Sequence, residues 1–111
     1  MAYRVRKHLP LLKLLKKAKP KLRKKLLASA DKELLHFFTE AAHNVLKGNV
    51  KLSPGQKKAL SRHKKPIRAL AQRRLSLKKK RQVLLQKGGF LPALLGPIIG
   101  IVTSLIGNLV R

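Results

Sequence analysis

The sequence contains no cysteine, no tryptophan and only three carboxylate side chains in 111 residues. Without cysteine the chain has no disulfide, no thiolate nucleophile and no zinc thiolate, and three carboxylates are few for general acid–base catalysis. Aromatic residues make up 4% of the chain, too few for the stacking surfaces that bind single-stranded nucleic acid. We therefore expect no enzyme: no catalytic residue, no cofactor, no metal ion and no small-molecule substrate.

Cationic side chains dominate instead. The 28 Lys and Arg residues give a formal net charge of +25 at pH 7. Charge of one sign opposes compaction by self-repulsion unless a polyanion neutralises it. Yet 44% of the residues are hydrophobic, far more than in a disordered basic tail. The composition therefore predicts a chain that folds around apolar side chains and binds a polyanion.

Charged and apolar residues are segregated along the chain. The acids Asp31, Glu33 and Glu40 fall within ten residues, and the segment from Gly88 to Val110 carries no charge. We divide the chain into basic amphipathic N-terminal helices over residues 1–28, a basic helical nucleic-acid-binding region over 29–87, and an apolar C-terminal segment with Gly and Pro over 88–111. Gly88 and Gly89 are the expected hinge.

Helix start and stop signals predict an all-α fold. We expect several short, basic, amphipathic helices that pack loosely and are partly disordered without a polyanion, followed by an apolar helical segment. The third helix is the best specified, because Ser29 is suited to cap it and Gly48 to end it. The predicted helices cover residues 9–19, 20–28, 29–47, 53–64 and 76–87.

Two stronger signals mark the second half of the chain. Ser53 and Gln56 have the spacing of a capping box, with Pro54 at the first helical position. Pro66 is expected to interrupt the helical pattern and to be followed by only a thin apolar stripe. Ser76 is expected to cap the helix that follows that stripe. No alternation typical of a strand is present.

The densest cluster of cations lies in residues 57–81. Duplex DNA carries one phosphate charge per about 1.7 Å of helix axis, so a dense array of Lys and Arg suits it. No zinc finger, recognition-helix fold or aromatic RNA-binding motif is present, so we expect phosphate contacts without base selection. The plainer alternative is a solvated basic face or a nuclear-targeting patch. The candidate nucleic-acid-binding residues are Lys57, Lys58, Arg62, Lys64, Lys65, Arg68, Arg73, Arg74, Lys78, Lys79, Lys80 and Arg81.

One face of the third predicted helix carries Glu33, His36, Glu40 and His43. The Glu-x-x-His pattern supplies metal ligands in di-iron bundles, where each copy comes from a different helix. Because a single helix cannot converge all four side chains on one ion, we interpret this face as polar. Its acids are expected to pair with lysines or imidazoles nearby.

The apolar segment leaves two alternatives open. Its 23 uncharged residues reach the length of about 20 that spans a bilayer, although Pro92 and Pro97 interrupt them. Gly96, Gly100 and Ser104 form a small-residue stripe on which another helix could pack. The segment is expected either to contact membrane or to form a hydrophobic hairpin that packs on the third helix or self-associates. The residues assigned to these roles are Phe90, Leu91, Leu94, Leu95, Gly96, Ile98, Ile99, Gly100, Ile101, Ser104 and Leu105.

The run KGGFLPALLGPII at residues 87–99, after a block rich in Lys and Arg, resembles precursors of the adenovirus core protein X (mu) family. More of the chain, most of residues 9–107, resembles the X-like late proteins of adintoviruses, which are Polinton or Maverick-type DNA viruses. That likeness includes residues 45–50, 52–54 and 62–65. It implies a virion core protein that condenses double-stranded DNA in the virion core and the host nucleus.

The same resemblance implies a candidate processing site at Gly88 and Gly89. The adenoviral protease favours an aliphatic residue, any residue, and then Gly-Gly. Here Gln86 stands where the aliphatic residue is expected, and Leu85 lies one place too early.

The leading interpretation is a virion core protein that binds and condenses double-stranded DNA without sequence specificity. A membrane-active or tail-anchored protein would use the same cations on anionic lipids together with the apolar segment. A small basic protein of a ribonucleoprotein would use them on RNA. Composition alone does not separate these three partners.

Folding is expected to increase when a polyanion is bound. Phosphates screen the lysines of helices that are marginal alone, so the helical circular dichroism signal should rise when duplex DNA is added. A signal that does not change with saturating DNA would contradict this expectation.

Overall fold

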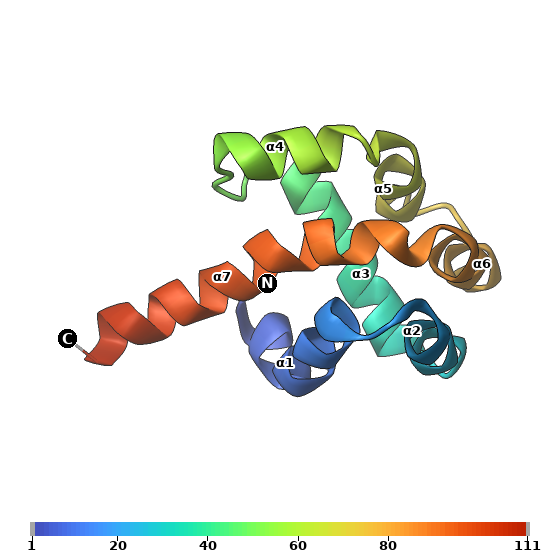
Figure 1. Ribbon diagram of the computed structural model, residues 1–111, viewed down its shortest axis with the longest axis horizontal. Helices are drawn as coiled ribbons and strands as arrows, with labels where there is room; N and C mark the ends of the chain where they lie inside the picture. The colour runs from blue at the N-terminus through green and yellow to red at the C-terminus, as the bar shows by residue number, and fades with distance from the viewer. Residues whose placement is uncertain (1, 111) are drawn as a thin grey trace.

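Capping residues and prolines separate the chain into helices. In the computed structural model, which describes the backbone of residues 2–110 and the side chains of residues 5–86 and 89–100, the chain is helical and has no strand. The predicted all-α class is confirmed. The elements are α1 (Ala2–Lys17), α2 (Pro20–Ala28), α3 (Lys32–Leu46), α4 (Pro54–Ser61), α5 (Lys64–Ala71), α6 (Leu77–Lys87), the 3-10 turn η1 (Gly88–Phe90) and α7 (Leu91–Val110) (Figure 1).

The local signals at α4 and α6 are confirmed. Ser53 Oγ accepts a hydrogen bond from the Gln56 backbone N–H at 3.2 Å, and Gln56 Oε1 accepts one from the Ser53 N–H at 2.9 Å. This reciprocal pair is a capping box. Ser76 Oγ accepts from the Lys79 N–H at 3.2 Å at the start of α6. The bounds predicted for α2 are also correct.

Other predicted boundaries are wrong. The N-cap of α3 is Asp31, whose Oδ1 accepts from the Leu34 N–H at 2.8 Å, whereas Ser29 is the C-cap of α2. Helix α1 starts at Ala2 instead of residue 9 and continues through Pro10. Burial of Val5 in the core accounts for the added first turns.

The region predicted as one helix over residues 53–64 ends at Ser61. After a short break, α5 begins at Lys64, so Pro66 lies in its first turn instead of interrupting the chain. A proline is tolerated there because its missing N–H would have no partner within the helix. The stripe after Pro66 is thus the buried face of a helix, with Ile67 and Leu70 in the core.

Helix α3 is the centre of the hydrophobic core, and α1, α5, α6 and α7 all pack against it. Its wide apolar face explains this position. Phe37 is fully buried beside Phe38 in an edge-on pair with ring centroids 5.6 Å apart. The buried residues of α3 are Leu34, Leu35, Phe37, Phe38, Thr39, Ala41, Ala42 and Val45.

The apolar C-terminal segment enters this core as one helix. It packs most extensively against α1 and also contacts α4 and α3. The hairpin alternative is wrong, since Pro97 lies within α7, whereas packing on the third helix is confirmed. The core therefore draws side chains from all three segments predicted from the sequence. Those from this segment are Phe90, Leu91, Leu94, Leu95, Ile98 and Ile99.

Within residues 5–86 and 89–100, no single helix has the length and hydropathy needed to cross a membrane. The pair Leu77–Gln86 and Leu91–Gly100 meets both criteria only together, and the two helices are bent by 107°. Among the residues assigned to membrane contact or self-association, Ile101, Ser104 and Leu105 lie outside the described side chains.

Truncating a core leucine of α7 should destabilise the whole protein. Leu94 is fully buried, so Leu94→Ala is expected to lower the free energy of unfolding by about 3 kcal/mol through lost burial and a cavity. Leu14→Ala is the matched control, because Leu14 is 44% exposed, and it should cost much less. Urea denaturation measures both. Equal effects would mean that α7 does not belong to the core.

Candidate nucleic-acid interface

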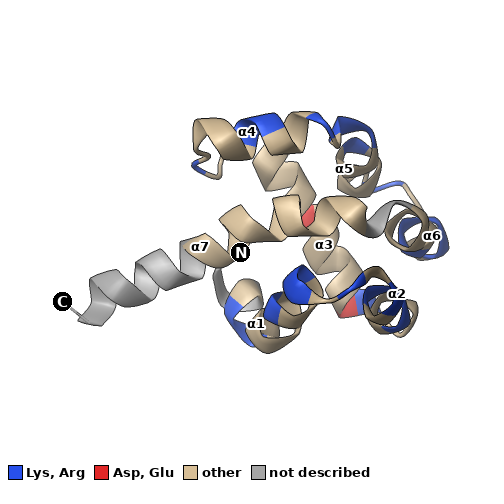
Figure 2. Cartoon of the chain, in the orientation of Figure 1, with Lys and Arg blue, Asp and Glu red and all other residues tan. Residues whose placement is uncertain are grey.

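The twelve candidate residues lie on α4, α5, α6 and the connections between them (Figure 2). Ten are exposed, and residues 51–87 contain no carboxylate. We call these ten the α4–α6 basic surface: Lys57, Lys58, Arg62, Lys64, Lys65, Arg68, Arg73, Arg74, Lys78 and Lys79.

Buried apolar residues on the opposite side of α5 orient its cations outward. In α5, Lys64, Lys65 and Arg68 follow the three- and four-residue spacing of one helix face. Ile67 and Leu70, on the other face, are buried against α3. In α4, Leu60 is the buried residue. In α5, helical spacing therefore places the cations on the exposed face and the apolar residues on the buried face.

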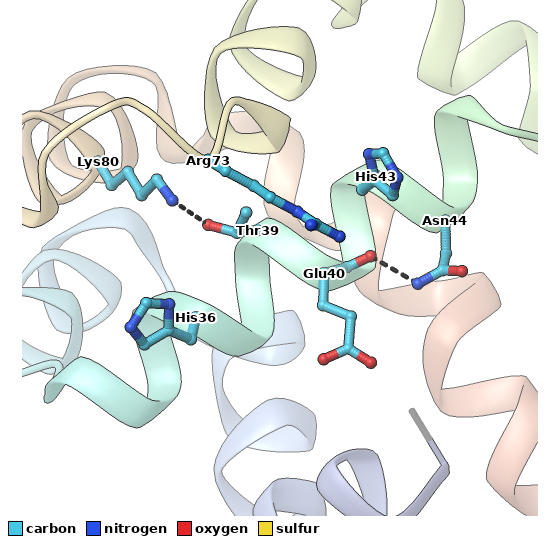
Figure 3. A pocket seen from close by; sticks show the side chains of 7 residues that line it. All are labelled: His36, Thr39, Glu40, His43, Asn44, Arg73 and Lys80. Atoms are coloured by element: carbon cyan, nitrogen blue, oxygen red, sulfur yellow. Dashed lines mark hydrogen bonds between the residues drawn. The ribbon is translucent and has the colours of Figure 1, made fainter.

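Lys80 is the exception, because it points into the protein. Its side chain is 2% exposed, and its Nζ donates to Thr39 Oγ1 at 2.5 Å (Figure 3). Thr39 in turn donates to the Leu35 carbonyl at 3.2 Å. Loss of hydration lowers the pKa of Lys80 below its ordinary value. This lysine joins α6 to α3 and is not part of the exposed surface.

Arg81 also makes an internal contact. Its Nη2 donates to the Ala30 carbonyl at 2.6 Å, which fixes the connection between α2 and α3 against α6. The side chain is half-buried. Two of the twelve predicted residues thus hold helices together in this structure.

A sequence signal for the burial of Lys80 exists. Leu77, Lys80 and Leu84 are spaced three and four residues apart, so they share one stripe of α6. Leu84 is fully buried and Leu77 is half-buried on that stripe. Because Lys80 is charged, sequence reasoning assigned it to the exposed cations and not to this apolar stripe.

A polar cavity of about 650 Å³ lies beside Lys80. Helix α3 supplies most of its lining, including His36 and His43, and Arg73 reaches over it from the connection between α5 and α6 (Figure 3). Asn44 Nδ2 donates to the Glu40 carbonyl at 2.8 Å at the edge of the cavity. Three of the four residues of the predicted polar face therefore line one cavity.

The fourth, Glu33, pairs elsewhere. Its Oε1 accepts a hydrogen bond from Lys7 Nζ of α1 at 2.7 Å, and His8 Nε2 lies 3.9 Å away. The hydrogen bond from Lys7 lowers the pKa of Glu33. This acid does pair with a lysine, but the predicted local pairing is wrong, because the lysine comes from α1. Over the described part of the chain, no group of three or more His, Cys, Asp or Glu residues could hold a metal ion.

A second cavity, of about 580 Å³, lies between η1, α5, α6 and the connection that precedes α5. Arg62 and Lys65 contribute basic groups to its lining, while Val83 and Phe90 contribute apolar surface. Gly89, one half of the candidate processing site, is exposed here and precedes the fully buried Phe90. The other half, Gly88, lies outside the described side chains.

The residues assigned to membrane contact or self-association are mostly interior in the described part. Gly96 is half-buried and Gly100 is exposed, so these two members of the small-residue stripe are less buried than the apolar residues around them. Comparison with known protein families, with curated proteins and with solved structures finds no match to this chain.

Replacing Lys80 with methionine should stabilise the protein at neutral pH. Lys80→Met removes a buried charge while keeping an unbranched side chain, and Thr39 keeps its bond to Leu35; we expect a gain of about 1 kcal/mol. Because the folded-state pKa of Lys80 is lowered, the unfolded chain binds more protons between that pKa and 10.5. The penalty is therefore full below the folded pKa, and the advantage of the variant shrinks as pH rises toward 10.5.

Lys79→Met is the control, since it removes the same charge from an exposed neighbour. Urea denaturation across pH 6 to 10 should show no comparable pH-dependent gain for that variant. Identical pH profiles for the two variants would show that the Lys80 ammonium carries no burial penalty.

Proposed function

We propose that this chain binds and condenses double-stranded DNA without sequence specificity, as a non-enzymatic protein of a viral core. The observation that carries the proposal is the α4–α6 basic surface, ten exposed cations on adjacent helices with no carboxylate among them. Ordinary solvated surfaces mix both signs of charge. A polyanion is the partner that such a surface neutralises best.

The strength of binding should follow from counterion release. Each neutralised phosphate of duplex DNA contributes about −0.9 to the slope of log K against log salt. If four of the ten cations contact phosphates, the slope is about −3.6. Affinity would then be high at low salt and fall steeply as salt rises.

The aromatic residues favour duplex over single-stranded nucleic acid as the partner. Phe37, Phe38 and Phe90 are fully buried, so no Phe side chain in the described part of the chain offers a stacking surface to a base. Single-strand binders depend on such stacking, whereas duplex binding through phosphates does not.

The viral part of the proposal rests on the sequence. The order of a basic block, Gly-Gly-Phe-Leu-Pro and an apolar tail resembles that of adenoviral X-type precursors and adintovirus X-like proteins. A location in the virion core and the host nucleus follows from that resemblance.

A membrane-active protein is the second candidate. The bent pair Leu77–Gln86 and Leu91–Gly100 has the combined length and hydropathy for membrane contact. Each Lys or Arg near an anionic membrane surface would add about 1 kcal/mol to binding. Insertion would, however, remove Leu91, Leu94 and Ile98 from the core, where they are fully buried.

The test measures binding of the full chain to two 30-base-pair duplexes of unrelated sequence over a range of salt concentrations. Truncation at residue 87 is unsuitable because it removes core side chains. Both duplexes should bind equally. Lys79→Met should make the salt slope shallower by up to about 0.9, whereas Lys80→Met, with the same change in charge, should leave it unchanged.

Flotation of the same chain on anionic vesicles distinguishes the candidates. Failure to bind duplex DNA at near-physiological salt, together with flotation on vesicles, would contradict the proposed function and favour the membrane candidate. Tighter binding to duplex RNA than to duplex DNA would favour a ribonucleoprotein partner.

A further inference from the structure

A second group of cations lies on α1 and α2, outside the predicted binding residues. Within each helix the spacing places three lysines on one face: Lys13, Lys16 and Lys17 in α1, and Lys21, Lys24 and Lys25 in α2. All six are exposed, and so is Lys19 between the helices. We call these seven lysines the α1–α2 basic surface.

Except at α6, the two basic surfaces lie on opposite sides of α7 (Figure 2). Helix α7 packs against α1 on one side and against α4 on the other. Figure 2 shows the blue segments of α4 and α5 above α7 and those of α1 and α2 below it, with the described part of α7 uncharged between them. Helix α6, which contacts both α2 and α5, joins the two surfaces at one end (Figure 1).

Screening limits the interaction between the cations of α4 and α5 and those of α1 and α2. The Cα atoms span 27 Å and 25 Å along the two shorter axes of the molecule. At physiological ionic strength exposed charges interact over only about 8 Å. A duplex that neutralises α4 and α5 therefore leaves most of the charge on α1 and α2 available.

The acids do not cancel this charge. Asp31 lines a cavity together with Lys25 of α2, but its side chain caps α3. Glu33 accepts its hydrogen bond from Lys7 of α1. Neither carboxylate forms an ion pair with any of the seven lysines within the described residues.

We propose that a single chain binds two DNA duplexes, one on each basic surface, and so bridges them. The inference rests on the proposed function. It assigns seven further residues to DNA binding and gives condensation a geometric basis: each chain cross-links duplex segments instead of only lowering their charge.

The experiment compares three variants that each replace four exposed lysines with glutamine and so carry the same net charge. One removes Lys13, Lys16, Lys21 and Lys24 from the α1–α2 surface. One removes Lys57, Lys58, Lys64 and Lys65 from the α4–α6 surface. The third divides the loss between the surfaces by removing Lys13, Lys21, Lys57 and Lys64.

Bridging is measured as energy transfer between donor-labelled and acceptor-labelled duplexes, at protein amounts well below charge neutralisation. Binding to one duplex is measured in parallel by anisotropy, and circular dichroism checks that each variant is folded. The wild type and the divided variant should bridge. Each one-sided variant should still bind one duplex but bridge at least about tenfold less, because one surface has lost most of its phosphate contacts.

The outcomes separate the two proposals. Absence of wild-type binding to a single duplex would overturn the proposed function. Wild-type binding without energy transfer would overturn bridging alone. Bridging by the one-sided variants that equals that of the divided variant would also overturn it, since associated chains or diffuse charge would then make the link.

Discussion

The fold depends on the burial of apolar side chains around α3, which outweighs the repulsion among the cations of the chain. Burying one large apolar side chain contributes about 1.5–3 kcal/mol, and the core gathers such side chains from every α-helix of the chain. Repulsion between exposed lysines is weak by comparison, because salt and water screen it within about 8 Å. Charge is tolerated as long as each helix turns it outward. The same arrangement leaves the cations free to meet a polyanion.

Lys80 is the exception to this separation of exposed cations from buried apolar side chains. It occupies a core position on α6, and its ammonium has Thr39 as its hydrogen-bond partner. A buried charge of this kind contributes little net stability, but it fixes how two helices meet. Together with Arg81, which holds the Ala30 carbonyl, it sets the position of α6 against α3 and the connection that follows α2. Two of the twelve residues in the densest basic cluster therefore hold helices together, and the other ten are exposed.

The sequence could predict elements whose signals are local. The capping box at Ser53 and Gln56 needs four neighbouring residues, and it is present as predicted. At the start of α3, Ser29 and Asp31 are both competent caps, and only the preceding helix, which ends at Ala28, decides between them. The start of α1 and the existence of α5 depend on burial of Val5, Ile67 and Leu70 by distant helices. Exposure of the α5 cations agrees with their helical spacing from the buried Ile67 and Leu70, whereas burial of Lys80 depends on the packing of α6 against α3.

The most extensive helix contact in the molecule joins α1 to α7, elements from opposite ends of the described chain. This contact has a consequence for synthesis. Helix α1 is synthesised before α7, so it meets its main partner only after α7 has been made. Contacts between such distant segments form slowly, because the intervening loop must be closed before they contribute. Until α7 has been made, the chain is a polycation whose core is incomplete. Nucleic acid bound during this interval would compete with the packing of α7 against α1.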